Sequence, residues 1–250
     1  MSGHSKWATI KRKKAANDAK RSNQYAKLLR AVEVAAREGG SGDVAANMTL
    51  ASAVEKAKSF SVPTENIDRA IKRGTGADDS GARYDEISYE GYAAGGIALF
   101  VEALTDNRNR TAQDVRYAFS RNGGNLGETG STAWMFARKG VVVVEKEAAP
   151  DEEHLLELAL EGGAEDLRDS ESSWDIISDP SAFARVRDAL ESAGVEVFSA
   201  EISMVPQSTI PVDGGEAKQV LNLIEALDEL DDVQNVYANF DIPEEVMASL

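Results

Sequence analysis

The chain has 250 residues, of which 42% are hydrophobic and 28% are charged, an ordinary composition for a soluble protein of two or three domains. It contains no cysteine, which excludes disulfides, thiolate nucleophiles and sulfur-ligated metals. The longest purely aliphatic run, 141–144, is far too short to span a membrane, and the N-terminus lacks the apolar core of a secretory signal. We therefore expect a cytoplasmic protein with no membrane partner.

Charge is distributed unevenly along the chain. The formal net charge is −16, yet residues 1–76 carry 15 basic and 7 acidic side chains, whereas residues 77–250 carry 12 basic and 36 acidic ones. Almost all of the positive excess precedes Arg37. Such a contrast between segments indicates a polyanionic partner at the basic end, and a solvated helix face is the simpler alternative.

The first segment is predicted to be a basic arm followed by three short helices. Residues 1–20 contain few apolar side chains and form the arm. Apolar residues then recur at helical spacing, with Ser, Pro or Gly at the boundaries, over 22–39, 44–60 and 63–74. The stretch "GTGADDSGA" at 74–82 is typical of a linker. We expect a basic arm plus a three-helix domain over 1–76.

From residue 84 the apolar pattern changes to a period of two. A hairpin is predicted around "YAAGG", then a helix near Thr111 and strands over 131–136 and 141–146. The whole segment 141–205 has the order β-α-β-β-α-β of a ferredoxin-like unit. A final helix over 216–230 and a strand over 233–240 cannot form a domain alone.

Because 84–138 lacks a second helix, we expect the end of the chain to return and complete it. The predicted fold class is α+β, with a small N-terminal helical domain followed by two α/β, ferredoxin-like domains, one inserted into the other. The expected boundaries are 82–139 with 208–250 for the discontinuous domain, and 141–206 for the insert.

No enzymatic chemistry stands out from the background. The two histidines, His4 and His154, are far apart and have no obvious ligand partners. The glycine-rich stretch 122–130 lacks the lysine and the strand–loop–helix context of a phosphate-binding loop. We therefore expect no enzyme, no catalytic residue, no metal and no cofactor.

Candidate nucleic-acid-binding residues lie in the arm and in one turn. In the arm, "GHSKW" at 3–7 combines cations with an aromatic ring beside "KRKK" at 11–14; lysines neutralise phosphates, and Trp or His stacks on bases. The turn "TDNRNRT" at 105–111 presents two arginines whose forked donors suit phosphate or a buried carboxylate. The full set is His4, Lys6, Trp7, Lys11, Arg12, Lys13, Lys14, Lys20, Arg21, Arg108 and Arg110.

Two structural alternatives stay open for these residues. Trp7 would serve equally well as an anchor that packs the arm onto its domain. In the turn, Asp106 and Arg108 would serve equally well to tie the backbone together internally.

Six motifs resemble the YebC/PmpR family in order along essentially the whole chain: "GHSKW" at 3–7, "NIDRAIKRGTG" at 66–76, "YEGY" at 89–92, "ALTDNRNRT" at 103–111, "NGGNLGETGS" at 122–131 and "DDVQNVYANFD" at 231–241. The resemblance implies a three-domain α/β protein with a helical first domain. Bacterial members of that family are usually labelled probable transcriptional regulators that bind DNA. A mitochondrial relative is a translational activator of cytochrome c oxidase subunit I, and related members are associated with the ribosome and with relief of stalling at proline-rich sequences.

Two hypotheses follow, a DNA-binding transcriptional regulator and a ribosome-associated translation factor that binds ribosomal RNA. No helix-turn-helix with base-reading side chains is evident, which favours structured RNA, whereas the family's usual label favours DNA. Both share nucleic-acid binding that regulates gene expression, and a monomer is the expected state.

Overall fold

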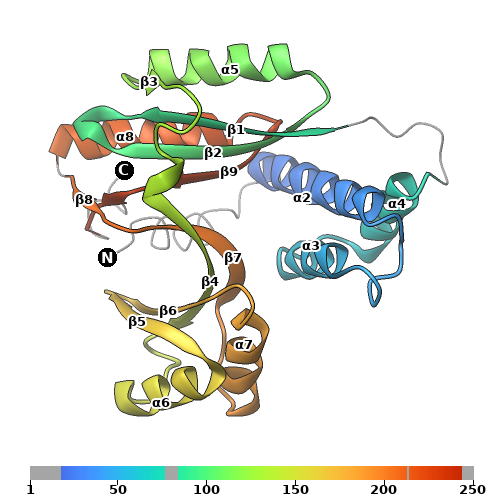
Figure 1. Ribbon diagram of the computed structural model, residues 1–250, viewed down its shortest axis with the longest axis vertical. Helices are drawn as coiled ribbons and strands as arrows, with labels where there is room; N and C mark the ends of the chain where they lie inside the picture. Colours follow the sequence, from blue (N-terminus) through green and yellow to red (C-terminus); the bar gives the residue numbers. More distant parts are fainter. Residues whose placement is uncertain (1–17, 77–83, 213, 244–250) are drawn as a thin grey trace.

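A computed structural model describes the protein over residues 18–76, 84–212 and 214–243 (Figure 1). A group of three helices precedes two four-stranded sheets, each of which has two helices on one face. The predicted α+β fold class is confirmed.

The three N-terminal helices are α2 (Asp18–Glu38), α3 (Met48–Ser59) and α4 (Thr64–Gly74). Helix α3 begins four residues later than predicted because the side-chain oxygen of Asn47 accepts a hydrogen bond from the Leu50 amide at 3.0 Å and caps the helix there. The predicted third helix does follow Pro63 directly. The helices enclose an apolar core in which Leu50 and Ile67 are fully buried.

The first sheet is built from both ends of the remaining chain. The predicted hairpin consists of β1 (Asp85–Tyr92) and β2 (Ala98–Thr105), joined through the short 3₁₀ helix η1 (Ala94–Gly96). On the outer side of β1 lies β3 (Asn125–Leu126), and β2 pairs with β9 (Val233–Ala238), which gives the antiparallel order β3-β1-β2-β9. The end of the chain therefore returns to the first sheet.

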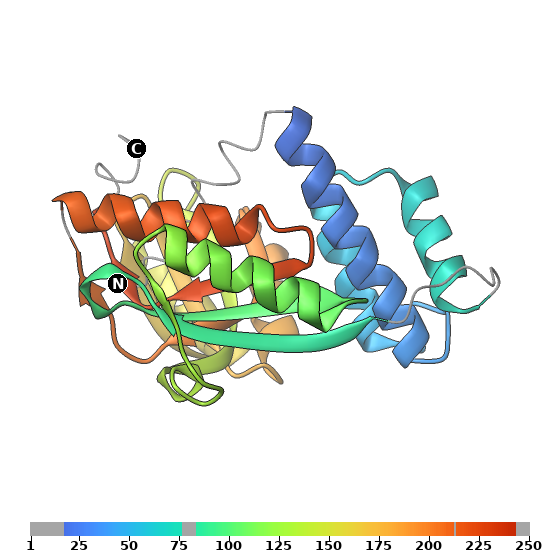
Figure 2. The same ribbon diagram turned by 90° about the horizontal axis from the view of Figure 1, so that it is seen from above.

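Two helices, α5 (Arg108–Arg121) and α8 (Gly214–Asp228), lie side by side on one face of this sheet (Figure 2). The predicted start of α5 at Thr111 is wrong, because Asn107 caps the helix by accepting a hydrogen bond from the Arg110 amide at 3.1 Å. Apolar side chains of α5, α8 and the sheet form the largest core, in which Phe119, Leu223 and Leu227 are fully buried.

The second sheet has the predicted β-α-β-β-α-β order and the arrangement β5-β6-β4-β7. One correction concerns its entry, where the predicted strands over 131–136 and 141–146 are a 3₁₀ turn, η2 (Ala133–Met135), followed by one continuous strand. That strand stays paired with β7 along its whole first half, so nothing interrupts it near residue 140. The elements are β4 (Phe136–Glu145), α6 (Glu152–Gly162), β5 (Ala164–Ser170), β6 (Ser173–Ser178), α7 (Phe183–Ser192) and β7 (Ser199–Pro206).

The two sheets meet through aromatic rings. Phe100 of β2 lies 6.2 Å from Phe136 of β4 and 6.3 Å from Tyr237 of β9, measured between ring centroids. Side chains alternate between the two faces of a strand. The rings of Phe100 and Tyr237 therefore lie on the face of the first sheet that α5 and α8 do not cover. A short parallel pair, β8 (Ile210–Pro211) with β10 (Phe240–Asp241), completes the strands of the described residues. Within the same residues, no helix is long and apolar enough to cross a membrane.

Candidate nucleic-acid interface

The predicted binding residues divide into three groups in the structure. Lys20 and Arg21 belong to the first turn of α2, although their side chains are not among those described. Arg108 and Arg110 lie in the first turn of α5, on a different part of the molecule. The remaining predicted residues precede residue 18 and lie outside the described residues: His4, Lys6, Trp7, Lys11, Arg12, Lys13 and Lys14.

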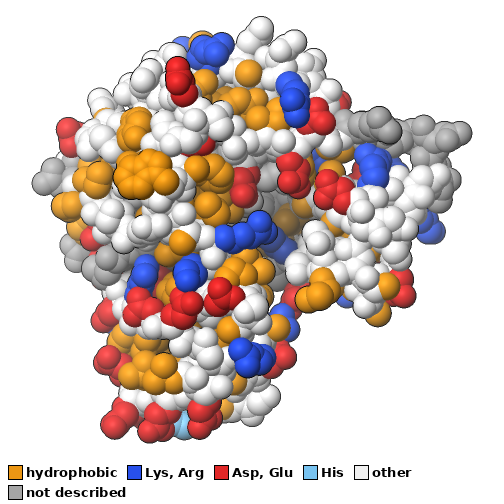
Figure 3. All heavy atoms as spheres, in the orientation of Figure 1, with side chains coloured by type: hydrophobic (Ala, Val, Ile, Leu, Met, Phe, Trp, Pro, Cys, Tyr) orange, Lys and Arg blue, Asp and Glu red, His pale blue; other side chains and the backbone are white. Residues whose placement is uncertain are grey.

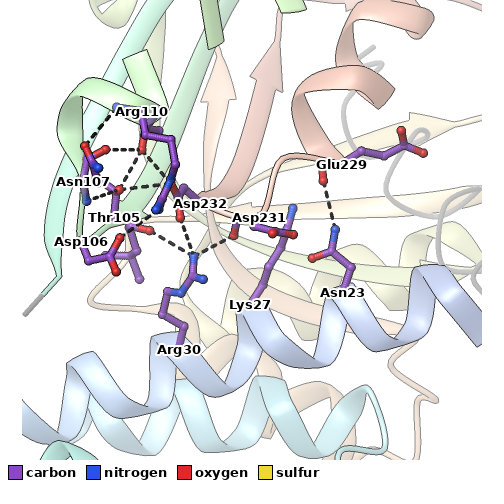
Figure 4. A network of polar contacts seen from close by, with 12 residues as sticks. Asn23, Lys27, Arg30, Thr105, Asp106, Asn107, Arg110, Glu229, Asp231 and Asp232 are labelled. Atoms are coloured by element: carbon purple, nitrogen blue, oxygen red, sulfur yellow. Dashed lines mark hydrogen bonds and ion pairs between the residues drawn. The ribbon is translucent and has the colours of Figure 1, made fainter. Parts of the chain in front are cut away.

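Helix α2, which follows the basic arm in the chain, is fastened to the first sheet by one row of side chains (Figure 4). Asn23 donates a hydrogen bond to the Glu229 carbonyl at 3.1 Å, and the Lys27 ammonium donates to the Asp228 carbonyl. Arg30 donates to the Asp231 carbonyl at 2.8 Å. Asp228 is the last residue of α8, and carbonyls at a helix C-terminus lack partners within the helix and carry partial negative charge, which favours the Lys27 ammonium there. Glu229 and Asp231 belong to the turn that leads from α8 to β9.

Asp232 lies at the centre of this junction and connects α2, α5 and β2. Its Oδ1 accepts from Arg30 at 3.2 Å, while Oδ2 accepts from Arg110 at 2.8 Å and from the hydroxyls of Thr105 and Thr111 at 3.1 and 2.7 Å. The Asp232 side chain is only 8% exposed. Every contact comes from a residue far away in sequence, so the junction fixes the three elements relative to one another.

Two opposing effects act on the pKa of Asp232. Burial alone would raise the pKa, because it removes the carboxylate from water. Hydrogen bonds from Arg110, Thr111 and Thr105, together with the Arg110 charge, outweigh burial and hold the pKa below its ordinary value of 3.8. Asp232 is therefore ionised at neutral pH and forms ion pairs with both Arg30 and Arg110.

The two arginines of the turn make ion pairs within the protein. Arg110 pairs with Asp106 at 2.9 Å in addition to Asp232, and Arg108 pairs with Asp85 at 2.8 Å, where both side chains are more than half exposed. The alternative of an internally tied turn is thus what these side chains form, with Asp106 paired to Arg110 and Arg108 paired to Asp85 of β1. A role of Arg108 and Arg110 in nucleic-acid binding stays a prediction.

A second buried carboxylate organises the loop 127–133, which overlaps the glycine-rich stretch 122–130 noted in the sequence. Glu90 of β1 is 3% exposed and accepts hydrogen bonds from the amides of Gly130, Thr132 and Ala133 at 2.7, 2.6 and 2.7 Å. Burial would raise the pKa of Glu90, but these donors lower it below its ordinary value of 4.5. The backbone amides of Gly130, Thr132 and Ala133 are therefore engaged by a carboxylate of the protein itself.

The helical group also contacts the second sheet, through ion pairs. Lys56 of α3 lies 2.9 Å from Glu201 of β7, and Glu55 accepts from Arg187 of α7. Each pair joins α3 to elements that follow it by more than 130 residues. The helical group is thus attached to both sheets, and α2 has a defined direction relative to them. Among the described residues, no group of three or more His, Asp or Glu side chains is arranged to hold a metal ion.

Comparison with known proteins places this geometry in a family. Residues 84–240 match the profile described as "TACO1/YebC second and third domain", and residues 5–77 match "TACO1/YebC protein N-terminal domain". The chain belongs to the TACO1/YebC family.

Relatives within the TACO1/YebC family are similar over their full length. A protein of Rubrobacter xylanophilus is 58% identical over all of this chain and 99% of its own, and one of Syntrophus aciditrophicus is 53% identical with the same coverage; both are named "Probable transcriptional regulatory protein". The crystal structure of a conserved hypothetical protein from Aquifex aeolicus is 44% identical and superimposes with a TM-score of 0.81 over 92% of this chain and 94% of that one.

Sequence reasoning missed the carboxylates that organise this TACO1/YebC structure, Asp232 and Glu90, and the arginine that pairs with Asp232. Asp232 and Glu90 lie in the motifs "DDVQNVYANFD" and "YEGY", and Arg30 lies in the basic segment, but the sequence assigned none of them a structural role. The one usable signal is that Glu90 lies within a predicted strand, where an unpaired buried charge would be costly. Asp232 lies in the turn before β9, next to another aspartate, and gives no such signal. In a chain with 43 acidic residues, the signal at Glu90 does not identify its partners.

Proposed function

We propose that this chain is a non-enzymatic, nucleic-acid-binding regulator of gene expression that contacts its target through the basic segment before Arg37. The observation that carries the proposal is the segregation of charge, because the positive excess of an acidic chain is concentrated in one segment. Lysines and arginines bind nucleic acids mainly by neutralising phosphates and releasing counterions. A protein of this kind works in the cytoplasm, where such targets lie.

The junction around Asp232 supports the proposal mechanically. Lys27 and Arg30 are committed to carbonyls and to Asp232, so they hold α2 in place. Lys20 and Arg21 precede this docked row on the same helix, and the cluster at 11–14 precedes them. The docked row therefore fixes the helix to which Lys20 and Arg21 belong.

The names of the relatives support transcription as the regulated process. The proteins of Rubrobacter xylanophilus and Syntrophus aciditrophicus carry names of transcriptional regulators. On this basis the first candidate target is DNA, with Arg108 and Arg110 as additional contacts through their exposed edges.

A second candidate, a ribosome-associated translation factor, is favoured by the charge of the rest of the chain. Residues 77–250 contain 36 acidic and 12 basic side chains. A body of that charge repels a long uniform duplex, whereas folded ribosomal RNA offers shaped surfaces that a single basic segment can enter. The two candidates share the basic segment and differ in what it binds.

The test of the basic segment is neutralisation of Lys11, Arg12, Lys13 and Lys14 to Gln in the full chain. We expect binding to duplex DNA or to ribosomes to be lost, with each lost phosphate contact lowering the log–log salt slope by about 0.9 on duplex DNA and about 0.7 on a single strand. A control with Arg185→Glu and Lys218→Glu changes the net charge by the same four units at exposed positions elsewhere. Equal loss in both variants would contradict the proposal.

The two targets are separated by sedimenting a lysate through a sucrose gradient at moderate salt, beside footprinting on promoter duplexes. Co-sedimentation with ribosomal subunits that the neutralised variant loses supports the translation factor. Protein found only at the top of the gradient, with sequence-selective footprints that survive physiological salt, supports the DNA-binding regulator.

A further inference from the structure

The outward face of α5 presents cations and an aromatic ring that the fold does not use. The helix contains four arginines and a single acidic residue, Asp114, within an acidic chain. Arg116 and Arg121 are exposed, and the Tyr117 side chain between them is 63% exposed. We call Arg116, Tyr117 and Arg121 the α5 patch. Lys and Arg side chains are visible at the top of the molecule, where α5 lies (Figure 3).

The two cations of the α5 patch differ from most other arginines of the described residues. Neither Arg116 nor Arg121 has a carboxylate within 4.0 Å among the described residues, so their charge is available to a partner. In contrast, arginines at seven other positions each form an ion pair with Asp or Glu: 30, 37, 73, 108, 110, 168 and 187.

Tyr117 and Arg121 contact each other within the patch. They are one helical turn apart, the Arg121 guanidinium carbon lies 5.9 Å from the centre of the Tyr117 ring, and Arg121 donates a hydrogen bond to the Tyr117 hydroxyl at 3.1 Å. Aromatic rings and guanidinium planes are the surfaces on which unpaired bases stack, and the remaining guanidinium donors suit phosphate. The contact also orients both side chains before any partner binds.

A merely solvated helix face is the simpler interpretation of α5, but it explains less. Solubility alone is served by mixed charges, and it gives no reason to leave a large ring exposed on a helix whose other aromatic, Phe119, is fully buried. The pairing of cations with a ring is instead the composition of a surface that binds polyanions carrying flat groups.

We propose that the α5 patch is a second contact site of this protein, which binds a single-stranded segment of nucleic acid by stacking a base on Tyr117 and pairing phosphates with Arg116 and Arg121. This inference rests on the proposed nucleic-acid-binding function and specifies its partner. The C-terminal end of α5, which carries the patch, lies away from the three-helix group (Figure 2).

The geometry favours a single strand over a duplex. In a duplex the base faces are covered by their neighbours, and only edges and phosphates are accessible. Helix α8 runs beside α5 on the same face of the sheet (Figure 2). A major groove of duplex DNA that received α5 would therefore also have to accommodate α8. An unpaired base meets no such obstruction at an exposed ring.

The test measures binding of the full-length protein to fluorescent 12-nucleotide oligouridylate, to oligothymidylate of equal length and to a 12-base-pair duplex. We expect Tyr117→Ala to weaken single-strand binding about fivefold or more, and Tyr117→Phe, which keeps the ring, to change it less than about twofold. Arg116→Gln with Arg121→Gln should lower the log–log salt slope by about 1.4, for two phosphate contacts. The matched control is Arg185→Gln with Lys218→Gln. The comparison of uridylate with thymidylate decides between RNA and DNA as the source of the strand.

The outcomes separate this inference from the proposed function. Loss of binding only when residues 11–14 are neutralised, with the α5 variants unchanged, overturns the α5 patch and leaves the proposed function standing. Loss of single-strand binding in the α5 variants, with the variant neutralised at 11–14 unchanged, supports the α5 patch and contradicts the proposed role of the basic segment. Equal weakening by the control pair, or equal effects of Tyr117→Ala on duplex and single strand, also overturns the patch. Photocrosslinking of a 5-bromouridine oligonucleotide to the peptide that contains Tyr117 supports it directly.

Discussion

The β3-β1-β2-β9 sheet and the β5-β6-β4-β7 sheet are each covered on one face by two helices, but the chain supplies them differently. The second sheet is built from one continuous stretch, from β4 to β7. The first takes β9 and α8 from the end of the chain. A sheet requires neighbouring strands with matching hydrogen bonds and a covered apolar face, and it does not require contiguous sequence.

The two units differ in the charge of one of their helices. Helix α5 of the first has four arginines and one aspartate, whereas α6 of the second has four glutamates and no lysine or arginine. Both helices bury an apolar face against their sheet. Architecture is therefore set by the buried face, while the outer face is free to select a partner. This is why the function has to be argued from particular side chains rather than from the fold.

The largest expected effect comes from removing the returning segment. We propose that 82–139 and 208–250 fold as one unit and that 141–206 is an independent insert. Truncation after Gln207 removes α8 and β9 and exposes the core around Phe119, so we expect aggregation and loss of cooperative unfolding. Size-exclusion chromatography and urea unfolding followed by circular dichroism measure both effects.

The matched variant replaces 138–204 with a four-residue Gly/Ser linker. Ala137 and Val205 are paired neighbours on β4 and β7, so the linker spans one rung of the sheet. We expect a monomer that unfolds cooperatively, because the first sheet and its helices remain complete. A well-folded truncation, or an unfolded excision, would show that the division into two units is wrong.

The next effect concerns the junction at Asp232. Replacement of Asp232 by Ala leaves Arg30 and Arg110 without their shared carboxylate. It also removes the acceptor of the Thr105 and Thr111 hydroxyls. We therefore expect the free energy of unfolding at pH 7 to fall by about 2–4 kcal/mol. The control is Asp85→Ala, which breaks an exposed pair with Arg108 and should cost less than about 1 kcal/mol. Similar losses in both variants would contradict the assignment of the junction.

A smaller effect is expected for Glu90→Gln. The Gln side chain keeps the shape of Glu but removes the negative charge that accepts three backbone hydrogen bonds. We expect this change to lower the free energy of unfolding at pH 7 by about 1–3 kcal/mol. Because the folded-state pKa of Glu90 is below 4.5, its contribution is complete above that pH and is lost as the pH falls through the lowered value. The difference between wild type and variant should therefore shrink in acid. A difference that is constant from pH 7 to pH 3 would exclude an ionised Glu90.

Much of the fold follows from local patterns. The third helix after Pro63, the hairpin around "YAAGG" and the β-α-β-β-α-β order were all predicted, because apolar periodicity and turn residues act within a few positions. The errors also have local causes. Asn47 and Asn107 capped their helices at positions that the apolar pattern does not mark, and β4 continued where two strands were expected.

By itself, the sequence determined the element order, the segregation of charge and the candidate cations. Only the tertiary structure decided which cations are engaged. Arg30 and Arg110 contact Asp232 across 202 and 122 residues, while Arg121 contacts Tyr117 and no carboxylate within the part of the chain that the structure describes. The strength of an ion pair depends on the distance between the charges and on their burial. Both quantities are set by the packing of segments that are far apart in the sequence, so local sequence patterns do not determine them.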